Sequence, residues 1–327
     1  MILAGDVGGT KTLVGLFERG EGRPRPKTIR AYATSRFRSF TDILDAFAAE
    51  VQYPFTVDAA VAGVAGPVAG GCAQLTNIAW DISAEEITAR FGTPRVRLLN
   101  DLEALATSVE LLTGAELEVL QTGTPDSHGN AVVIAAGTGL GEACLYRVGG
   151  HAASFRALPS EAGHADFAAR TNPEIELVRM LRKRYGRAEV EQVLSGPGLV
   201  NIHRLTHGGR PCDQVPDTRD PDAPARISKA ALDASCPRCA EALGIFVEAF
   251  GAEAGNLALR GKATAGVYIG GGIAPKILQV LRDGRFMRAF LAKPPMAGLL
   301  ARMPVKVILN PEAGLLGAAF AAQELLD

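Results

Sequence analysis

The sequence of 327 residues has no excess of charge of either sign, with 34 Lys and Arg against 35 Asp and Glu. It therefore lacks the basic footprint that nucleic acids and anionic membrane surfaces attract. It also lacks an apolar run of the roughly 20 residues that a membrane helix needs. The opening stretch MILAGDVGG has neither a basic region nor a cleavage site of small residues. We therefore expect a soluble, cytoplasmic protein whose partners are small molecules, with no nucleic acid and no membrane among them.

Cysteine is also scarce, with five residues in a large chain, which is typical of reduced thiols in the cytoplasm. The stretch CPRC at 236–239 could be half of a zinc site, but no second C-x-x-C supplies the other half of four ligands. Cys212 with His203 or His207 could contribute only if folding brought them together. We therefore favour a helix terminus beside two inert thiols.

The stretch AGDVGGTKT, residues 4–12, begins and ends like a P-loop, G-x-x-x-x-G-K-[ST]. Thr10, however, stands where that motif needs its second Gly, and no helical pattern of apolar residues follows at once. A side chain at this position would crowd the backbone amides that wrap around a phosphate chain. Short apolar runs at 2–5 and 12–17 instead predict a β-hairpin with the glycine loop between its strands.

The rest of the N-terminal part predicts a third strand and then alternating helices and strands. The third strand is expected at 28–34, and an apolar stripe at 40–51 predicts an amphipathic helix. Residues 57–71 predict a buried strand that passes into a glycine-rich loop, SAEE at 83–86 a capping box that opens a helix, and RVRLLN at 95–100 another strand. The order β-β-β-α-β-α-β-α indicates an α+β core in which the later crossovers make parallel pairs.

The pattern begins again in the second half of the chain. Residues 130–149 are once more a strand, a glycine loop and a strand, as at 2–17, which suggests two related halves. A third glycine cluster, YIGGGIAP at 268–275, follows an apolar strand. The last segment predicts a terminal helix with Asn310 as its cap and Pro311 at its first position.

Each glycine loop alone is an ordinary turn between strands, but three together favour phosphate binding. Exposed backbone amides make concavities for anions, and the hydroxyls of Thr10 and Thr138 add donors. Two such hairpins facing each other could hold both ends of a triphosphate. Asp6, at the end of the first strand, would then partner a divalent cation, directly or through water. Alternatively, it is a turn residue that binds its own backbone.

Seven stretches, in their order along the chain, resemble the bacterial glucokinase family of the hexokinase and actin-like ATPase superfamily, in its proteobacterial form. The resemblance runs from residue 2 to about 320. Any one of these motifs is shared more widely, and LPSEAGHADF and EQVLSGPGLVN are the specific ones. It implies an α/β protein with the two-lobed ribonuclease H-like, actin-like ATPase fold and a duplicated β-β-β-α-β-α-β core. The stretches are GDVGGTKT, LLNDLEALA, AAGTGLG, LPSEAGHADF, EQVLSGPGLVN, YIGGGIAP and NPEAGLLGAA.

The resemblance implies an ATP-dependent glucokinase, which forms glucose 6-phosphate and ADP from D-glucose and MgATP. A smaller domain would comprise residues 1–110 and 306–327, and a larger one residues 111–305. Asp6 would lie at Mg²⁺, and a homodimer is expected. The residues that would bind the nucleotide are Gly5, Asp6, Val7, Gly8, Gly9, Thr10, Lys11, Gly137, Thr138, Gly139, Gly271 and Gly272.

Transfer of a phosphoryl group to an alcohol needs a base that takes the hydroxyl proton. Asp101 stands after a strand and before a helix, so it is expected at the carboxyl edge of a sheet, where ligands of α/β proteins bind. From the local sequence, a helix N-cap suits the same residue equally well. The resemblance favours the catalytic interpretation.

Glu161 and His164 form an E-x-x-H pair that could be mistaken for metal ligands on a helix, but Pro159 and Gly163 argue against a continuous helix. Carboxylates, amides and imidazoles can instead bind the hydroxyls of a sugar with directional specificity. The resemblance assigns sugar binding to Asn100, Asp101, Glu161, His164 and Glu191, with Gly66 and Asn77 in or near a mobile loop over the sugar.

Two alternatives stay open from the sequence. One is a kinase of another hexose, such as mannose, fructose or N-acetylmannosamine. The other is a sugar sensor without activity, against which Asp6 and Asp101 argue, because a pure binder needs no base. For a kinase, the two lobes are expected to close on the sugar and so keep water from competing for the phosphoryl group.

Overall fold

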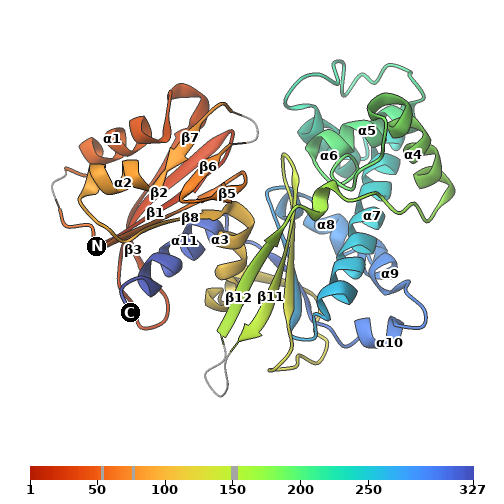
Figure 1. Ribbon diagram of the computed structural model, residues 1–327. Coiled ribbons are helices and arrows are strands. Elements are labelled where there is room, and N and C mark those ends of the chain that lie inside the picture. The colour runs from red at the N-terminus through yellow and green to blue at the C-terminus, as the bar shows by residue number, and fades with distance from the viewer. Residues whose placement is uncertain (53–54, 76–77, 149–153) are drawn as a thin grey trace. The chain divides into compact units, whose positions relative to one another are not determined.

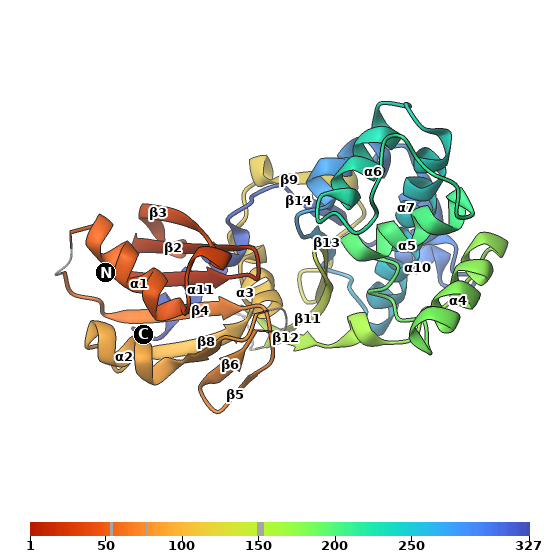
Figure 2. The same ribbon diagram turned by 90° about the horizontal axis from the view of Figure 1, so that it is seen from above.

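The computed structural model describes residues 1–52, 55–75, 78–148 and 154–327. Its contacts divide the chain into two compact units, shown from two directions in Figures 1 and 2. Unit 1 comprises Met1–Glu116, Phe155–Pro159 and Asn310–Asp327, and unit 2 comprises Leu117–Ser154 and Ser160–Leu309. The C-terminal helix, blue in Figure 1, therefore lies with the red and orange elements of the N-terminal part.

Unit 1 is built around a five-stranded sheet in the order β3-β2-β1-β4-β8. The β1–β2 hairpin predicted from the sequence is present, with Asp6 opposite Leu13 in antiparallel register. The predicted third strand and the two later strands are also present, and β1, β4 and β8 run parallel. The strands are β1 (Ile2–Val7), β2 (Lys11–Glu18), β3 (Arg25–Ala33), β4 (Ala59–Val64) and β8 (Val96–Asn100).

Helices cover both faces of this sheet. The residues predicted to form an apolar stripe, such as Ile43 and Phe47, are fully buried against it. The C-terminal helix packs on β1, β4 and the first helix after β8. The helices are α1 (Phe40–Glu50), α2 (Ala84–Phe91), α3 (Asp101–Thr107) and α11 (Ala313–Glu324).

Three details of unit 1 differ from the sequence predictions. A small antiparallel sheet, β5 (Val68–Ala69), β6 (Cys72–Gln74) and β7 (Asp81–Ser83), lies where only a loop was expected. At α2, Ser83 accepts a hydrogen bond from the amide of Glu85, so the helix begins as predicted, but the Glu86 carboxylate accepts from Thr41 rather than closing a capping box. The order of elements is therefore longer than β-β-β-α-β-α-β-α.

The third difference concerns the C-terminal helix, whose predicted cap was wrong. The Asn310 side chain accepts a hydrogen bond from the amide of Glu312, at 2.8 Å, and so stabilises a turn that contains Pro311. The helix α11 begins only at Ala313, with Glu312 at its N-cap and no side-chain cap.

Unit 2 repeats the sheet of unit 1. Its sheet has the order β12-β11-β10-β13-β14-β9, and the order of its first five strands matches β3-β2-β1-β4-β8. The directions also match for four of them, because β10 pairs antiparallel with β11 and parallel with β13, which pairs parallel with β14. The predicted duplication is thus present in the topology. The strands are β9 (Leu117–Gln121), β10 (Ala131–Ala136), β11 (Leu140–Val148), β12 (Ser154–Ser160), β13 (Gly266–Gly270) and β14 (Val305–Ile308).

The core of unit 2 forms around α7, whose aromatic rings pack edge to face with those of α9, as at Phe250 and Phe286, 5.7 Å apart. Contrary to expectation, α7 is by length and composition apolar enough to cross a membrane. However, 78% of its apolar 18-residue stretch is buried inside the protein. The helices are α4 (Asn172–Tyr185), α5 (Gly196–His207), α6 (Ala223–Leu232), α7 (Pro237–Gly261), α8 (Leu278–Leu281), α9 (Arg285–Leu291) and α10 (Ala297–Leu300).

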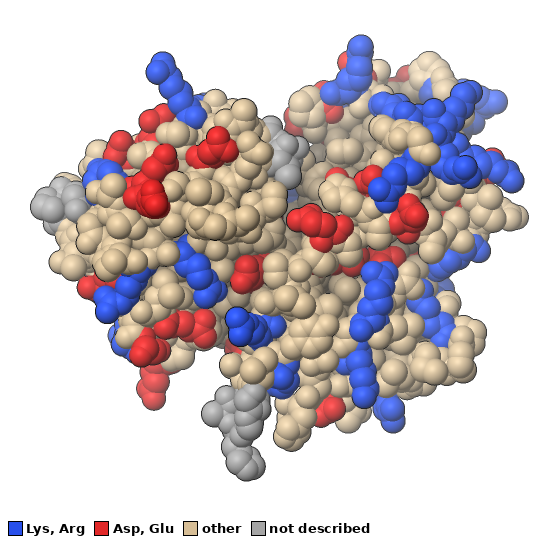
Figure 3. Space-filling view, viewed as in Figure 1, with Lys and Arg blue, Asp and Glu red and all other residues tan. Residues whose placement is uncertain are grey.

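Charges of both signs occur on the visible face of each unit (Figure 3). Basic side chains gather most densely in the region of α4, whose last turn contains Arg182, Lys183 and Arg184. Cations are favourable at this end of a helix, where the last carbonyl groups have no partners within the helix.

Candidate functional site

The first glycine loop is the turn between β1 and β2. The amide of Gly8 donates to the carbonyl of Lys11, at 3.1 Å, and an added Cβ at Gly8 would lie only 2.9 Å from that same oxygen. A strand rather than a helix follows the loop, as expected from the absence of the second P-loop Gly. The turn therefore depends on the absence of a side chain at Gly8.

Thr34, the first residue after β3, supports this loop, which the sequence did not indicate. Its hydroxyl donates to the carbonyl of Gly8 at 2.8 Å, and its amide donates to the carbonyl of Thr10 at 3.1 Å. The buried Thr12 hydroxyl lies 2.9 Å from that of Thr34. These contacts fix the shape of the loop and leave Thr10 and Lys11 exposed.

Asp6 is the second-last residue of β1 and lies opposite Gly63 in the parallel register with β4. Burial raises the pKa of Asp6 to about 6, although the nearby Lys11 ammonium acts in the opposite direction. An added Cβ at Gly314, near the start of α11, would lie 2.9 Å from Oδ2 of Asp6. The sequence thus places a desolvated carboxylate between the glycine loop and a helix N-terminus.

Asn100 and Asp101 lie where β8 ends and α3 begins. Asn100, not Asp101, is the N-cap: its Oδ1 accepts from the amide of Leu102 at 2.9 Å, while its Nδ2 donates to the carbonyl of Gly66 at 3.3 Å. Asp101 is the first residue of the helix, and its Oδ1 also accepts from the Leu102 amide at 2.9 Å. The N-cap role that the local sequence allowed for Asp101 therefore belongs to Asn100.

Gly66 lies against β6 of the small sheet, so closely that an added Cβ would be 2.0 Å from the carbonyl oxygen of Gln74. Its carbonyl holds the Asn100 amide, which connects the loop after β4 to the end of β8. Asn77, predicted near the same loop, lies outside the described residues.

The second glycine loop, between β10 and β11, is held by a carboxylate and by a helix. The amide of Gly137 donates to the carbonyl of Gly139 at 2.8 Å, and the amide of Gly196, at the start of α5, donates to the carbonyl of Gly137 at 2.9 Å. Oε2 of Glu191 accepts from the amide of Leu140 at 2.8 Å, and an added Cβ at Gly139 would lie 2.6 Å from this oxygen.

The third glycine cluster lies beside the second loop, at the same edge of the unit 2 sheet. Gly271 has a φ of 83°, which favours glycine, and an added Cβ would meet the carbonyl oxygen of Ala136 at 2.2 Å. The amide of Ile273 donates to that same carbonyl at 3.2 Å. The two loops and the N-terminus of α5 therefore line one edge with backbone amides and little side-chain bulk.

Glu161 precedes a single 3-10 turn, Ala162–His164, of which His164 is the last residue, so the predicted break in the helix is confirmed. Gly163 lies so close to β11 that an added Cβ would be 2.2 Å from the carbonyl oxygen of Leu140. Its own carbonyl accepts from the amide of Glu191 at 2.8 Å. The turn thus brings Glu161, His164 and Glu191 together within unit 2.

Glu189 is a further member of this cluster that the sequence did not reveal. Nδ1 of His164 lies 2.9 Å from Oε2 of Glu189, and this hydrogen bond raises the pKa of His164, with Glu191 and Glu161 contributing in the same direction. Arg187 completes the group with an ion pair to Glu189, at 3.5 Å. Only the nearness of Glu189 to Glu191 in the sequence could have indicated it.

The predicted site residues fall into two groups. Unit 1 brings together the first glycine loop, Asp6, Gly66, Asn100 and Asp101 at one edge of its sheet, and unit 2 brings together the other two glycine loops with Glu161, His164 and Glu191. Each group combines glycine loops that expose backbone amides with polar side chains of the kinds that can bind hydroxyl groups.

The duplicated sheet and these two groups of residues define a sugar kinase with the two-lobed actin-like ATPase fold. The chain belongs to the glucokinase family, whose model matches residues 3–325. A glucokinase from Nostoc punctiforme is 36% identical over 343 residues, covering 99% of both chains.

Solved structures agree with this assignment. The crystal structure of a glucokinase from an Antarctic psychrotroph is 29% identical, with a TM-score of 0.85 and coverage of 99% of this chain and 98% of that one. A glucokinase from Balamuthia mandrillaris, solved in complex with glucose, has a TM-score of 0.80 at 21% identity, covering 98% of this chain and 93% of that one. The second comparison bears on the fold alone.

Proposed function

We propose that the protein is an ATP-dependent glucokinase, which transfers the γ-phosphoryl group of ATP to the 6-hydroxyl of D-glucose and releases glucose 6-phosphate and ADP. Membership of the glucokinase family supports the reaction. The residues of the site have the chemistry that phosphoryl transfer to an alcohol requires.

The observation that carries the proposal lies within unit 1. The strands β1, β4 and β8 are parallel and adjacent, with Asp6 opposite Gly63 and Val64 opposite Asn100. Since neighbouring strands are about 4.8 Å apart, the backbone at Asp6 and at Asn100 is separated by roughly 10 Å. This spacing suits a phosphoryl group held at the glycine loop and a hydroxyl group held beside Asp101.

Asp101 is proposed as the base. Its carboxylate accepts hydrogen bonds only, so a sugar hydroxyl beside it would donate its proton toward the carboxylate as the bond to phosphorus forms. The Leu102 amide bonded to Oδ1 keeps the carboxylate oriented. Asn100 would position the same sugar through its amide, which the Gly66 carbonyl fixes.

Mg²⁺ is proposed to lie at Asp6. Magnesium is commonly held by one or two carboxylates together with substrate phosphates and water, and the single desolvated carboxylate beside the glycine loop fits such a donor set. When bound, the ion would neutralise charge on the β- and γ-phosphates. Within the chain, Asp6 holds the negative charge that retains it.

The polar cluster of unit 2 is proposed to bind the remaining hydroxyls of the sugar. The His164 ring would donate or accept a hydrogen bond according to its protonation state. Glu189 favours the protonated ring, because its hydrogen bond raises the pKa of His164. Glu191 would use its carboxylate both for the sugar and for the Leu140 amide, and would so link the sugar to the second phosphate loop. The proposed nucleotide contacts are those predicted from the sequence at 5–11, 137–139 and 271–272.

The test is a coupled assay of ADP release with MgATP and a panel of glucose, mannose, fructose, N-acetylmannosamine and no sugar. Glucose should give the highest kcat/KM. Asp101→Asn keeps the shape of the side chain but removes the base, so we expect kcat to fall by ~10²-fold or more, with glucose binding largely retained in calorimetry. Glu103→Gln, two residues further along α3, serves as a matched control with near-normal turnover.

Each contrary result has a distinct meaning. Near-normal activity of Asp101→Asn would contradict its role as base. A higher kcat/KM with another sugar of the panel would keep the reaction class and change the substrate. Absence of ADP release while glucose still bound would leave a sugar sensor.

Three broader expectations remain proposals. The smaller domain, 1–110 with 306–327, would carry the base and the first phosphate loop, and the larger domain, 111–305, the sugar cluster and the adenosine loop. The enzyme would act as a homodimer in the cytoplasm, and sedimentation equilibrium with and without glucose would measure its assembly state.

A further inference from the structure

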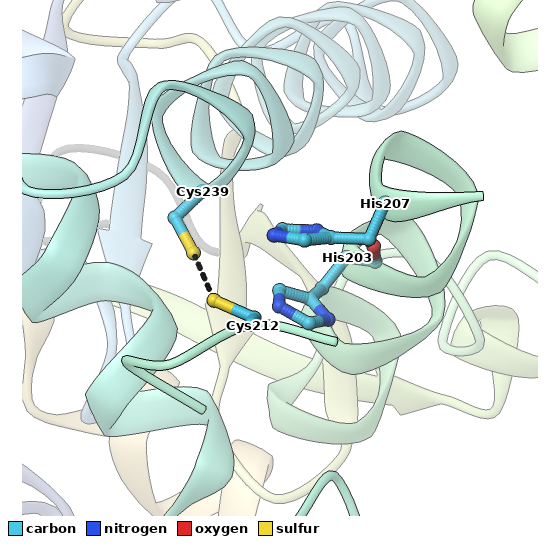
Figure 4. A group of neighbouring side chains, drawn as sticks. All are labelled: His203, His207, Cys212 and Cys239. Carbon is cyan, nitrogen blue, oxygen red and sulfur yellow. Dashed lines mark hydrogen bonds between the residues drawn. The ribbon is translucent and has the colours of Figure 1, made fainter. Parts of the chain in front are cut away.

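A cluster of cysteine and histidine side chains lies in unit 2, apart from every residue proposed for the kinase reaction. His203, His207, Cys212 and Cys239 place their ligand atoms within 4.8 Å of one another, and all four residues are buried (Figure 4). Cys236 adjoins the group, since its Sγ lies 3.9 Å from Sγ of Cys212. The sequence left this possibility open only if folding brought these residues together, and it does.

We propose that this cluster binds one zinc ion as a structural site. Cys212, Cys239 and His207 are three of its ligands, and Cys236 or His203 is the fourth. The inference is independent of the proposed function.

The distances between donor atoms fit tetrahedral zinc. With Zn–S bonds of about 2.3 Å and Zn–N bonds of about 2.05 Å, a tetrahedron has S···S edges of about 3.8 Å and N···S edges of about 3.6 Å. Sγ of Cys212 lies 3.9 Å from Sγ of both Cys236 and Cys239. Nε2 of His207 lies 3.5 Å from Sγ of Cys236.

The two histidines supply a second observation that points to a metal. Among the described residues, neither ring nitrogen of the buried His203 has a hydrogen-bond partner, which is costly for a polar group without water. The ring stacks on that of His207, with centroids 3.8 Å apart. A metal ion in contact with this ring would give one of its nitrogens a partner.

His207 is held in the tautomer that a metal requires. Its Nδ1 lies 2.9 Å from the carbonyl oxygen of His203, so Nδ1 carries the proton and donates it to that carbonyl. Nε2 is then the nitrogen with the free lone pair, and it is the one that points toward Cys236. Metal-binding histidines are commonly oriented by such a bond to a backbone carbonyl.

The ligands come from the end of α5, from the loop that follows it and from the start of α7. The histidines lie in the last two turns of α5, Cys212 lies in the loop after it, and the CPRC stretch forms the start of α7, with Cys236 at its N-cap. A pocket of about 330 Å³ lined by His207, Cys212 and Cys236 gives the ion an entry path from the surface. An enclosed set of four protein ligands is typical of structural rather than catalytic zinc.

Binding changes only protonation, with no change of oxidation state. The cysteine thiols that become ligands lose their protons to solvent as Zn–S bonds form, while the histidines bind as neutral rings. A disulfide is the competing outcome, but it would need an S–S separation of about 2.05 Å, well below the 3.9 Å between Cys212 and either neighbour.

The test begins with tag-free protein purified without chelators. Elemental analysis should give one zinc per chain, and replacement by Co²⁺ should give the intense visible bands of tetrahedral thiolate coordination. Titration with a thiol reagent should modify the cluster cysteines only after the zinc is removed. The thermal midpoint of the metal-free protein should then be lower by about 5 °C or more, because metal that binds only the folded state stabilises it.

Cys239→Ser should lose the zinc, whereas Cys72→Ser, which removes an exposed thiol in β6, should retain it. His203→Ala and Cys236→Ser are then compared, and the variant that binds zinc more weakly identifies the fourth ligand. If Cys239→Ser does not fold, the cobalt spectrum and thiol titration of the unaltered chain still test the proposal.

The proposal is overturned if the purified chain contains no zinc and does not bind added Zn²⁺ or Co²⁺ at micromolar concentration. It is equally overturned if mass spectrometry finds a disulfide between Cys236 and Cys239 in the native protein, or if Cys239→Ser binds zinc with unchanged affinity.

Discussion

Some side chains of the proposed site lower the free energy of unfolding of this protein. Asp6 is the clearest case, because burial raises its pKa from an ordinary value of 3.8 to about 6. Above pH 6 the folded protein must keep a desolvated carboxylate ionised, whereas the unfolded chain solvates it. Ionised Asp6 therefore lowers the free energy of unfolding above pH 6, and this penalty disappears as the pH falls toward 3.8.

Asp6→Asn should therefore stabilise the protein at high pH and inactivate it. Two pK units correspond to about 3 kcal/mol, which is the upper limit for the gain in the free energy of unfolding at pH 8. At pH 4 most of this gain should be lost, because Asp6 is then neutral in the folded protein. Urea unfolding at the two pH values measures the difference, and the coupled assay should show turnover reduced at least ~10-fold at saturating ATP because the magnesium ligand is lost.

Glu21→Gln is the control, since it removes a carboxylate from an exposed position of the same unit. It should change the free energy of unfolding by less than about 0.5 kcal/mol at either pH. Equal stability of Asp6→Asn and the unaltered protein at pH 8 would contradict the penalty ascribed to burial. Full Mg²⁺-dependent activity would contradict the role of Asp6 at the metal.

The site residues that could be predicted from the sequence lie in short patterns of neighbouring residues. Asp6 and Gly8 could be predicted because a glycine loop between two short apolar runs indicates a hairpin. Thr34 and Glu189 could not, because each acts through a partner that is distant in the chain or on another element. A threonine or glutamate in a polar stretch has many possible partners, and only the fold selects one.

Strands and helices place the sugar cluster through close backbone contact, and Gly163 is the position that tests this. An added Cβ there would lie 2.2 Å from the carbonyl oxygen of Leu140, which belongs to β11 and cannot move alone. Gly163→Ala should therefore lower the free energy of unfolding by about 1–3 kcal/mol, as overpacking does. It should also raise the KM for glucose, because Glu161 precedes the displaced turn and His164 is its last residue.

Gly298→Ala is the matched substitution in α10, where no described atom lies within 4 Å of an added Cβ. Alanine has a higher helix propensity than glycine, so this change should be neutral or stabilise by up to about 1 kcal/mol. Urea unfolding and glucose kinetics of both variants provide the comparison. An unchanged glucose KM in Gly163→Ala would show that the turn does not position the cluster.

Hydrophobic periodicity predicts long helices and strands but not very short ones. The stripe at 40–51 predicted α1, which Ser39 caps in the structure, because a helix of 11 residues repeats its pattern several times. The strands β5, β6 and β7 have two or three residues each, too few to establish an alternation. They are defined by pairing with one another rather than by their own sequence.

Across the full chain, the informative signal was repetition. The recurrence of strand, glycine loop and strand predicted two related halves, and the two sheets indeed share the order of five strands and the direction of four of them. The metal cluster gave no such signal, because its residues come from a helix end, a loop and the start of another helix. The CPRC stretch lies at a helix start, as predicted, and only the fold brings Cys212 and the two histidines to it.

The proposed sugar set draws on both units, which leads to a prediction about backbone dynamics. If Asn100 and Asp101 bind the same glucose as Glu161, His164 and Glu191, glucose must protect backbone amides of both units from hydrogen exchange. The segments expected to slow are 101–107 in unit 1 and 162–167 and 190–194 in unit 2. Exchange followed by mass spectrometry, with L-glucose as the control ligand, measures them separately.

Asp101→Asn sharpens this measurement, because it should bind glucose without turning it over. Protection of both sets of segments in this variant, in the absence of ATP, would mean that the two units bind the sugar together before any chemistry occurs. Protection limited to unit 2 would contradict sugar binding by Asn100 and Asp101, and protection limited to unit 1 would contradict the cluster of Glu161, His164 and Glu191. Sugar binding ahead of ATP would suit a kinase, which must keep water from competing for the phosphoryl group.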